Sequence, residues 1–216
     1  MSNDRQLQEA VLTELNWDQR VTAAHIGVTA NAGVVTLTGH VDTFAQKQAA
    51  EDAAWRIKGV KAVAEEIEVR LAPETQRRDE DIATAAIDRL AWDVSIPRNA
   101  VKVRVEDGWV TLTGQVDGYY QKVSAEEDIR RSFGVVGVSN QIEIKPQVNI
   151  RDNSDSIMHA LHRSWFFDPK TISVSAQGGK VRLSGTVRSP HDRAMAAATA
   201  WAAHGVTQVE NDIAIV

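Results

Sequence analysis

The sequence predicts an α+β fold made of three tandem α-β-β-α-β units, each a small three-stranded mixed sheet with two helices on one face. The first observation is a repeated phrase, because Leu-Thr-Gly-His-Val at 37–41 returns with small changes at 112–116 and 183–187. The second is a set of three glycines per unit, with internal spacings of 6 and 20 residues in every copy. Such periodicity indicates one supersecondary unit repeated along the chain. The repeated glycines are Gly33, Gly39 and Gly59; Gly108, Gly114 and Gly134; and Gly179, Gly185 and Gly205.

The first element of each unit is predicted to be a helix. Apolar residues recur four positions apart, as on the buried face of an amphipathic helix. They are Leu7, Val11 and Leu15; Ile82, Ala86 and Leu90; and Ile157, Leu161 and Trp165. A tryptophan lies at or near the end of each helix, at positions 17, 92 and 165, and we expect it to plug the edge of the core.

Two strands joined by a tight turn are expected next. The turns are Ala32-Gly33, Asp107-Gly108 and Gly178-Gly179, and Asp-Gly between alternating apolar runs is typical of a β-hairpin. The inward residues of the first strands are Ile26, Val28 and Ala30; Val101, Val103 and Val105; and Ile172, Val174 and Ala176. Those of the second strands are Val35, Leu37 and Val41; Val110, Leu112 and Val116; and Val181, Leu183 and Val187.

The glycine within each second strand, at 39, 114 and 185, is expected on the same inward face. We interpret it as room for a closely packed helix, and the alternative is a ligand contact. A second helix with a stripe of small residues follows and ends at the third repeated glycine as a C-cap. The stripe residues are Ala50, Ala54 and Ile57; Ala125, Ile129 and Ser132; and Ala196, Ala200 and Ala203.

The last strand of each unit begins shortly after that glycine. Its apolar residues are Val63, Ile67 and Val69; Val138, Ile142 and Ile144; and Val209, Ile213 and Ile215. Short polar linkers containing Pro73 and Pro146 separate the units, since proline prevents a strand or helix from running through. We therefore place the domains at 1–71, 77–146 and 151–216.

These motifs resemble the BON domain family, and within it the osmotically inducible protein Y group. The hairpin pattern is Val-x-Val followed by Gly-x-Val-x-Leu-x-Gly-x-Val, as at 101–116, and the closing pattern is Gly-Val-x-x-Val-x-Asn-x-Ile, as at 134–142 and 205–213. The first unit departs, with Glu65 where the others have Asn140 and Asn211. The resemblance covers nearly the whole chain. It implies a periplasmic or outer-membrane stress protein that binds phospholipid or membranes and has no catalytic motif.

Composition excludes several classes of protein. The net charge of −5 argues against a nucleic-acid binder, which needs a basic patch to neutralise phosphates. The absence of cysteine excludes disulfides, thiolate catalysis and zinc sites built on cysteine. No apolar run reaches the roughly 18–20 residues of a membrane span. The N-terminus lacks the pattern of a signal peptide, so we expect a cytoplasmic protein as written, and a periplasmic one if the true start lies upstream or a signal was removed.

No catalytic, metal-binding or cofactor-binding site is predicted. The six histidines fall at different positions in different units, so no repeated site uses them. His159 and His162 lie three residues apart on a predicted helix, where they either share a zinc ion or simply face solvent. The sequence contains neither a nucleophile elbow nor a Walker loop nor a Rossmann fingerprint. We therefore predict that the protein is not an enzyme.

The residues most suited to contact a surface are tryptophans and outward-facing basic residues. Trp55 and Trp201 share one position on the second helix, and Trp109 faces outward beside Lys102 and Arg104. Each tryptophan is either partly buried between units or an amphipathic anchor for a membrane or a protein partner.

Residues 147–216 carry 7 basic and 6 acidic side chains, whereas the first two units are each net −3. Lys180, Arg182 and Arg188 of the third unit are expected to face outward, either toward an anionic surface or only toward water.

The predicted function is that of a non-enzymatic, stress-type binding or scaffolding protein. It would interact with phospholipid membrane surfaces or protein partners, without a cofactor, nucleic acid or transmembrane segment. The alternative is a soluble cytoplasmic module for a ligand or a monovalent cation, since BON units also occur in such proteins. In that case the acidic first and second units would supply the oxygen ligands.

Overall fold

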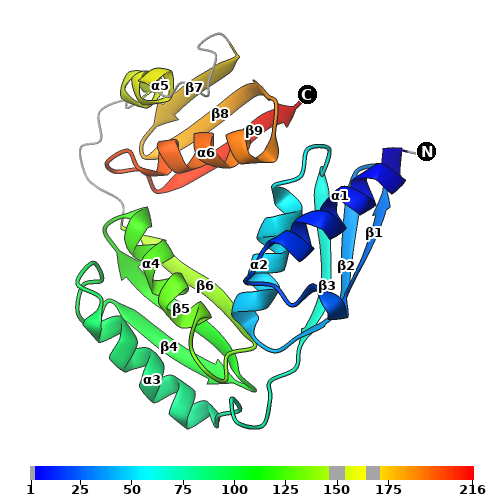
Figure 1. Ribbon diagram of the computed structural model, residues 1–216. Helices are drawn as coiled ribbons and strands as arrows, with labels where there is room; N and C mark the ends of the chain where they lie inside the picture. Colours follow the sequence, from blue (N-terminus) through cyan, green and yellow to red (C-terminus); the bar gives the residue numbers. More distant parts are fainter. Residues whose placement is uncertain (1–2, 146–153, 164–170) are drawn as a thin grey trace. The chain divides into compact units, whose positions relative to one another are not determined.

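Each of the three predicted units is an α-β-β-α-β module in the computed structural model (Figure 1). The structure describes residues 3–145, 154–163 and 171–216. The predicted core residue Trp165 and most of the linker around Pro146 lie outside these ranges. No helix within them is long and apolar enough to span a membrane.

The order of elements is the same in each unit. The first unit consists of α1 (Asn3–Trp17), a short 3₁₀ turn (Ala23–His25), β1 (Ile26–Asn31), β2 (Val34–Val41), α2 (Phe44–Trp55) and β3 (Ala62–Val69). The second consists of α3 (Asp79–Trp92), β4 (Val101–Glu106), β5 (Trp109–Val116), α4 (Tyr119–Arg130) and β6 (Gly137–Ile144). The third consists of α5 (Ser154–Arg163), β7 (Ile172–Gln177), β8 (Lys180–Val187), α6 (Pro190–Trp201) and β9 (Gln208–Ile215).

Every sheet is three-stranded and mixed, as predicted. The strand orders are β1-β2-β3, β4-β5-β6 and β7-β8-β9. In the first unit β1 and β2 are antiparallel, with Ile26 opposite Gly39, and β2 and β3 are parallel. The third unit repeats this register, with Ile172 opposite Gly185. The antiparallel pair needs only a tight turn, whereas the parallel pair needs the crossover helix between its strands.

The two helices of a unit cover one face of its sheet (Figure 1), and the core lies between them and the strands. The predicted apolar stripes supply that core, because a four-residue spacing keeps side chains on one helix face. The buried stripe residues of the first helices are Leu7, Val11 and Leu15; Ile82, Ala86 and Leu90; and Ile157 and Leu161. Those of the second helices are Ala50 and Ala54; Ala125 and Ile129; and Ala196 and Ala200.

The hairpin turns are two-residue loops in which both residues have positive φ. The values are 49° and 86° at Ala32-Gly33, 50° and 76° at Asp107-Gly108, and 57° and 83° at Gly178-Gly179. This is the pattern of a type I′ turn, whose twist matches that of the strands it joins.

The glycines within the second strands have a different role from the one we expected. Gly39, Gly114 and Gly185 are not buried against a helix, and their φ values are 116°, 132° and 127°. A Cβ placed on Gly114 would overlap the backbone carbonyl oxygen of Ala100, and the equivalent overlap occurs at the other two glycines. The close neighbour is therefore the chain just before the first strand of the hairpin, and not the second helix.

The glycines that follow the second helices also differ from expectation. The helices end at Trp55, Arg130 and Trp201, four residues before the corresponding glycine. Gly59, with φ of 98°, instead lies at the end of the turn that leads into the last strand. Its left-handed conformation shapes this turn, so the glycine does not cap the helix directly.

Candidate functional site

An exposed tryptophan ends the first helix of both the first and the second unit. Trp17 is 81% exposed and Trp92 is 86% exposed, so the prediction that they plug the core edge is wrong. The reason is helical geometry. Leu15 and Leu90 are the last buried residues of α1 and α3, and two further residues rotate a side chain about 200° around the helix axis. Each indole therefore faces solvent.

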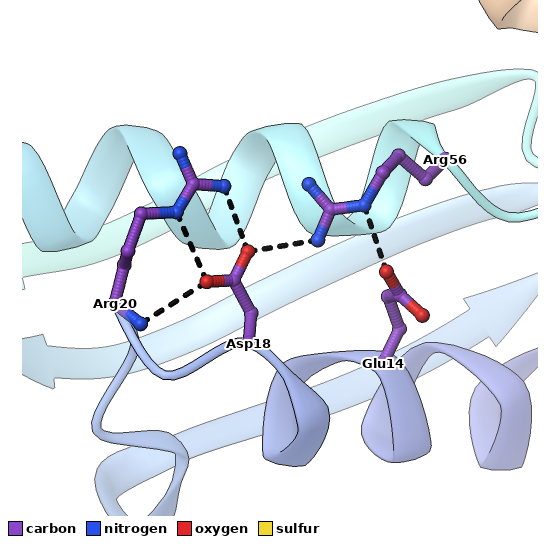
Figure 2. Close-up of polar contacts among 4 residues, drawn as sticks. All are labelled: Glu14, Asp18, Arg20 and Arg56. Atoms are coloured by element: carbon purple, nitrogen blue, oxygen red, sulfur yellow. Dashed lines mark hydrogen bonds and ion pairs between the residues drawn. The ribbon is translucent and has the colours of Figure 1, made fainter.

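A polar network beside Trp17 joins the end of α1 to the end of α2 (Figure 2). The side chain of Asp18 is only 9% exposed. Its two oxygens accept hydrogen bonds from the guanidinium of Arg20 at 2.8 and 3.0 Å, and Oδ1 also accepts from the Arg20 backbone N–H at 3.1 Å. Arg56 donates to Asp18 Oδ2 at 2.8 Å and to Glu14 Oε1 at 2.7 Å.

This network fixes the charge of Asp18. The hydrogen bond from the Arg20 guanidinium is the largest cause that lowers the pKa of Asp18 well below its usual range, and Arg56 adds to it. Burial acts in the opposite direction and is outweighed. The carboxylate therefore stays ionised at neutral and mildly acidic pH and cannot serve as a general acid. The network connects the end of α1 to the end of α2. It lies at the rim of a shallow depression that Trp17 also lines.

The double guanidinium contact is not repeated in the second unit. There Asp93 takes the place of Asp18, and its Oδ1 accepts hydrogen bonds from the backbone N–H and the hydroxyl of Ser95 at 2.8 and 2.7 Å. The positions of Glu14 and Arg20 are held by Arg89 and Ser95. The equivalent turn of the third unit lies outside the described residues.

A second polar contact joins the last strand to the second helix in each unit. Asn140 Nδ2 donates to the backbone carbonyl of Lys122 at 2.8 Å, while its Oδ1 accepts from a backbone N–H two residues further along the strand at 3.2 Å. Asn211 repeats both contacts, at 3.1 Å to the carbonyl of Arg193 and at 3.3 Å within the strand. One amide side chain thus ties strand and helix together.

In the first unit, Glu65 makes the equivalent connection with different chemistry. Its Oε1 accepts from the backbone N–H of Ile67 at 2.8 Å. Its Oε2 lies 2.7 Å from the ammonium of Lys47, which also donates to the Ile67 carbonyl at 2.7 Å. A carboxylate cannot donate to a helix carbonyl as an amide can, so here the helix supplies the donor, and the Lys47 ammonium reaches the strand. The departure at Glu65 is therefore compensated by an ion pair.

This compensation gives a prediction for two substitutions at one position. Glu65→Ala should destabilise the first unit by about 1–2 kcal/mol, because it removes an acceptor and leaves the half-buried Lys47 ammonium without its carboxylate. Glu65→Asn should cost clearly less, because it restores the residue that the other two units use. Chemical denaturation of both variants checks this. Equal losses of stability in the two variants would show that asparagine at position 65 does not replace the ion pair between Glu65 and Lys47.

The BON domain family model matches the chain over residues 3–70, 78–146 and 151–216. The chain belongs to the BON domain family. Each α-β-β-α-β unit is accordingly one BON domain, and the resemblance drawn from the hairpin and asparagine motifs is confirmed.

The BON chain is also similar to individual proteins. Osmotically-inducible protein Y of Escherichia coli (strain K12) is 33% identical over 129 residues, which are 58% of this chain and 64% of that protein. The match thus spans less than two thirds of that relative. Two structures of CdsD, a structural protein of the Type III secretion system of Chlamydia trachomatis, align at 15% identity over 98% and 100% of this chain and 92% and 100% of theirs. Their TM-scores of 0.26 and 0.27 are too low to support an argument.

The predicted surface tryptophans divide into two groups. Trp55 and Trp201 are half-buried, and each packs against the core of its own BON domain. Trp109 is 50% exposed on the open face of the second sheet, where a Cβ placed on Gly137 of the neighbouring strand would overlap its ring. This indole therefore covers a glycine, as large aromatic and small residues do when they pair across strands.

The basic residues of the third BON domain face outward as expected, but their charge is partly neutralised. Lys180, Arg182 and Arg188 are exposed. The guanidinium of Arg182 lies 2.7 Å from Asp212 Oδ2 and 4.0 Å from Glu210 Oε2, both on the neighbouring strand. Alternation along one strand does not reveal charges on the strand beside it. The parallel pairing of β8 with β9 adds two acids to the same face.

The basic pair of the second BON domain is similar. Lys102 and Arg104 are both exposed on β4. Arg104 donates to Glu106 Oε2 at 2.6 Å, so an acid on the same strand offsets part of its charge. Charge alone therefore gives this sheet face little attraction for an anionic surface.

Proposed function

We propose that this chain is a non-enzymatic, stress-related binding protein whose first two BON domains attach to phospholipid membrane surfaces through Trp17 and Trp92. The observation that carries the proposal is the almost complete exposure of an indole at the same position in two domains. Tryptophan is favoured at membrane interfaces, because its ring is apolar while its N–H remains solvated. The similarity to an osmotically inducible protein supports the link to stress.

The apolar surface is better suited to this attachment than the charged surface. The chain has a net charge of −5, and acids accompany Arg104 and Arg182. Val94 follows Trp92 and is fully exposed, which adds apolar area to the same turn. Binding driven by such area depends weakly on salt, whereas binding driven by lysine and arginine weakens steeply as ionic strength rises.

The network around Asp18 supports the proposal through rigidity. Three hydrogen bonds from Arg20 to the Asp18 carboxylate hold the turn directly after Trp17, and one from Arg56 joins that turn to the end of α2. A side chain presented from a fixed backbone loses less conformational freedom when it binds.

Replacing both indoles should weaken vesicle binding. We expect Trp17→Ala with Trp92→Ala to lower the partition coefficient about tenfold or more, because each buried aromatic side chain contributes about 1.5–3 kcal/mol. The measurement is co-sedimentation of the full chain with vesicles of zwitterionic phospholipid containing a minor anionic fraction. Tyr120→Ala is the matched control, since Tyr120 is an exposed aromatic residue elsewhere on the second domain.

Other outcomes would point elsewhere. Equal binding of the wild type and the double variant would exclude the indoles as anchors. The membrane contact would lie on the third domain if salt abolishes binding and if binding depends on Lys180, Arg182 and Arg188. If the wild type binds no vesicles, the exposed indoles would instead fit a protein partner. A higher melting temperature in K⁺ than in Na⁺ would favour the monovalent-cation module.

A further inference from the structure

Two histidines of the first BON domain pack edge to face against each other on the sheet. The ring centroids of His25 and His40 are 4.6 Å apart, and the ring planes are inclined by 62°. His25 is the last residue of the 3₁₀ turn before β1, and His40 lies in β2. Ile26 is opposite Gly39, so the two histidines occupy the next pair of opposing positions.

A carboxylate continues the same row of positions. His40 is beside Glu68 in the parallel pairing of β2 with β3. Side chains alternate along a strand, and Val41 points into the core, so His40 lies on the open face. Glu68 shares that face and accepts hydrogen bonds from Arg70 at 2.7 and 2.9 Å. The row across the sheet is therefore histidine, histidine and glutamate.

The second BON domain shows that side chains in this row reach one another. There Gln115 Nε2 donates to Glu143 Oε2 at 3.3 Å, at the positions of His40 and Glu68. Ala100 replaces His25 in the second domain, and the third has no histidine in the row. The paired imidazoles therefore belong to the first domain alone.

We propose that His25 and His40 together bind a divalent transition-metal ion of the kind that prefers imidazole, namely Cu²⁺, Ni²⁺ or Zn²⁺. Such ions favour nitrogen ligands over the carboxylate and carbonyl oxygens that suit Mg²⁺ and Ca²⁺. Two nitrogens on one ion, each at about 2.1 Å, lie roughly 3 Å apart. The ring centroids, 4.6 Å apart, place the two imidazoles close enough for one ion to contact a nitrogen of each.

The site supplies two nitrogen ligands and leaves the other coordination positions open. Within the described ranges, no group of three or more histidine, cysteine, aspartate or glutamate side chains is arranged to hold a metal ion. Water therefore completes the coordination shell, while the Glu68 carboxylate favours a cation nearby. A metal held by both histidines would link the start of β1 to β2 and stabilise the first domain by mass action.

The test is a calorimetric titration of the full chain with CuCl₂, NiCl₂ or ZnCl₂. His25→Ala and His40→Gln introduce the residues that the second domain has at these positions, so the fold should accommodate both. Each should weaken the tightest site about tenfold or more, a loss at least as large as that from removing an outer-shell partner. His159→Ala is the matched control, because His159 is an exposed histidine on α5.

Electron paramagnetic resonance of bound Cu²⁺ gives a second readout. The wild type should show coupling to two nitrogen nuclei, and each single variant should show coupling to one. Melting curves without metal establish that the variants are folded. The proposal is overturned if a variant that combines His25→Ala with His40→Gln binds as tightly as the wild type, or if His159→Ala alone abolishes binding. The imidazoles would then only pack against each other.

Discussion

Gly114→Val should unfold the second BON domain at much lower denaturant concentration than the wild type. Gly114 has φ of 132°, and its missing Cβ would overlap the carbonyl oxygen of Ala100. Backbone strain and overpacking each cost about 1–3 kcal/mol, and neither can be relieved by moving a flexible side chain, so we expect a loss of about 3–5 kcal/mol. Native-state hydrogen exchange over residues 101–145 isolates this domain within the full chain.

Gly178→Ala is the control that separates strain from steric overlap. Gly178 also has positive φ, at 57°, but nothing lies within 4 Å of an added Cβ. The first domain already has Ala32 at the equivalent turn position, with φ of 49°. We expect a loss of about 1–2 kcal/mol. If Gly114→Val is as mild as Gly178→Ala, the carbonyl contact is not the reason for the glycine.

The position of these glycines could be predicted from the sequence, but their role could not. The 6- and 20-residue spacings locate Gly39, Gly114 and Gly185 in the second strand of each hairpin. The chain just before the first strand can lie close to each glycine because the glycine adopts a positive φ. No pattern of side chains in the sequence indicates this backbone conformation. The sequence therefore favours the helix, the nearest predicted neighbour, as the reason for the glycine.

The fold was predictable because it depends on periodicities that the sequence repeats three times. The stripe of Leu7, Val11 and Leu15 identifies a helix and its buried face from spacing alone. The same geometry also predicts that Trp17, two residues beyond Leu15, faces away from the core. Our prediction for Trp17 was wrong because it relied on the usual burial of tryptophan and not on this angle.

The candidate sites were less predictable, for different reasons. Arg56 reaches Asp18 from another helix, a contact between positions 38 residues apart with no motif to link them. The pairing of His25 with His40 is different, because both lie equally far from the Ala32-Gly33 turn. A two-residue hairpin loop fixes the register of the strands it joins. That signal was present in the sequence, but a search for histidines repeated among units passes over it.

Asp18→Asn should destabilise the first BON domain by about 1–3 kcal/mol at pH 7. The substitution removes the charge that two guanidinium groups share, while Asp18 itself is largely buried. Breaking a fully buried pair costs about 3–5 kcal/mol, but Arg20 and Arg56 are more exposed, and solvent screening reduces that figure. Asp93→Asn is the matched control, because Ser95 supplies neutral hydrogen bonds in the second domain.

The pH dependence of this loss identifies its cause. The pKa of Asp18 is lowered in the folded state by its hydrogen bonds to Arg20 and Arg56. Its contribution to stability is therefore complete above the ordinary aspartate pKa of about 4, and it declines as pH falls below that value. The free-energy difference between wild type and Asp18→Asn should be constant from pH 7 to about pH 5 and should shrink on further acidification. A difference that does not change down to pH 2 would attribute the loss to altered packing, because the contribution of a carboxylate with a lowered pKa must decline once the unfolded state binds a proton that the folded state does not.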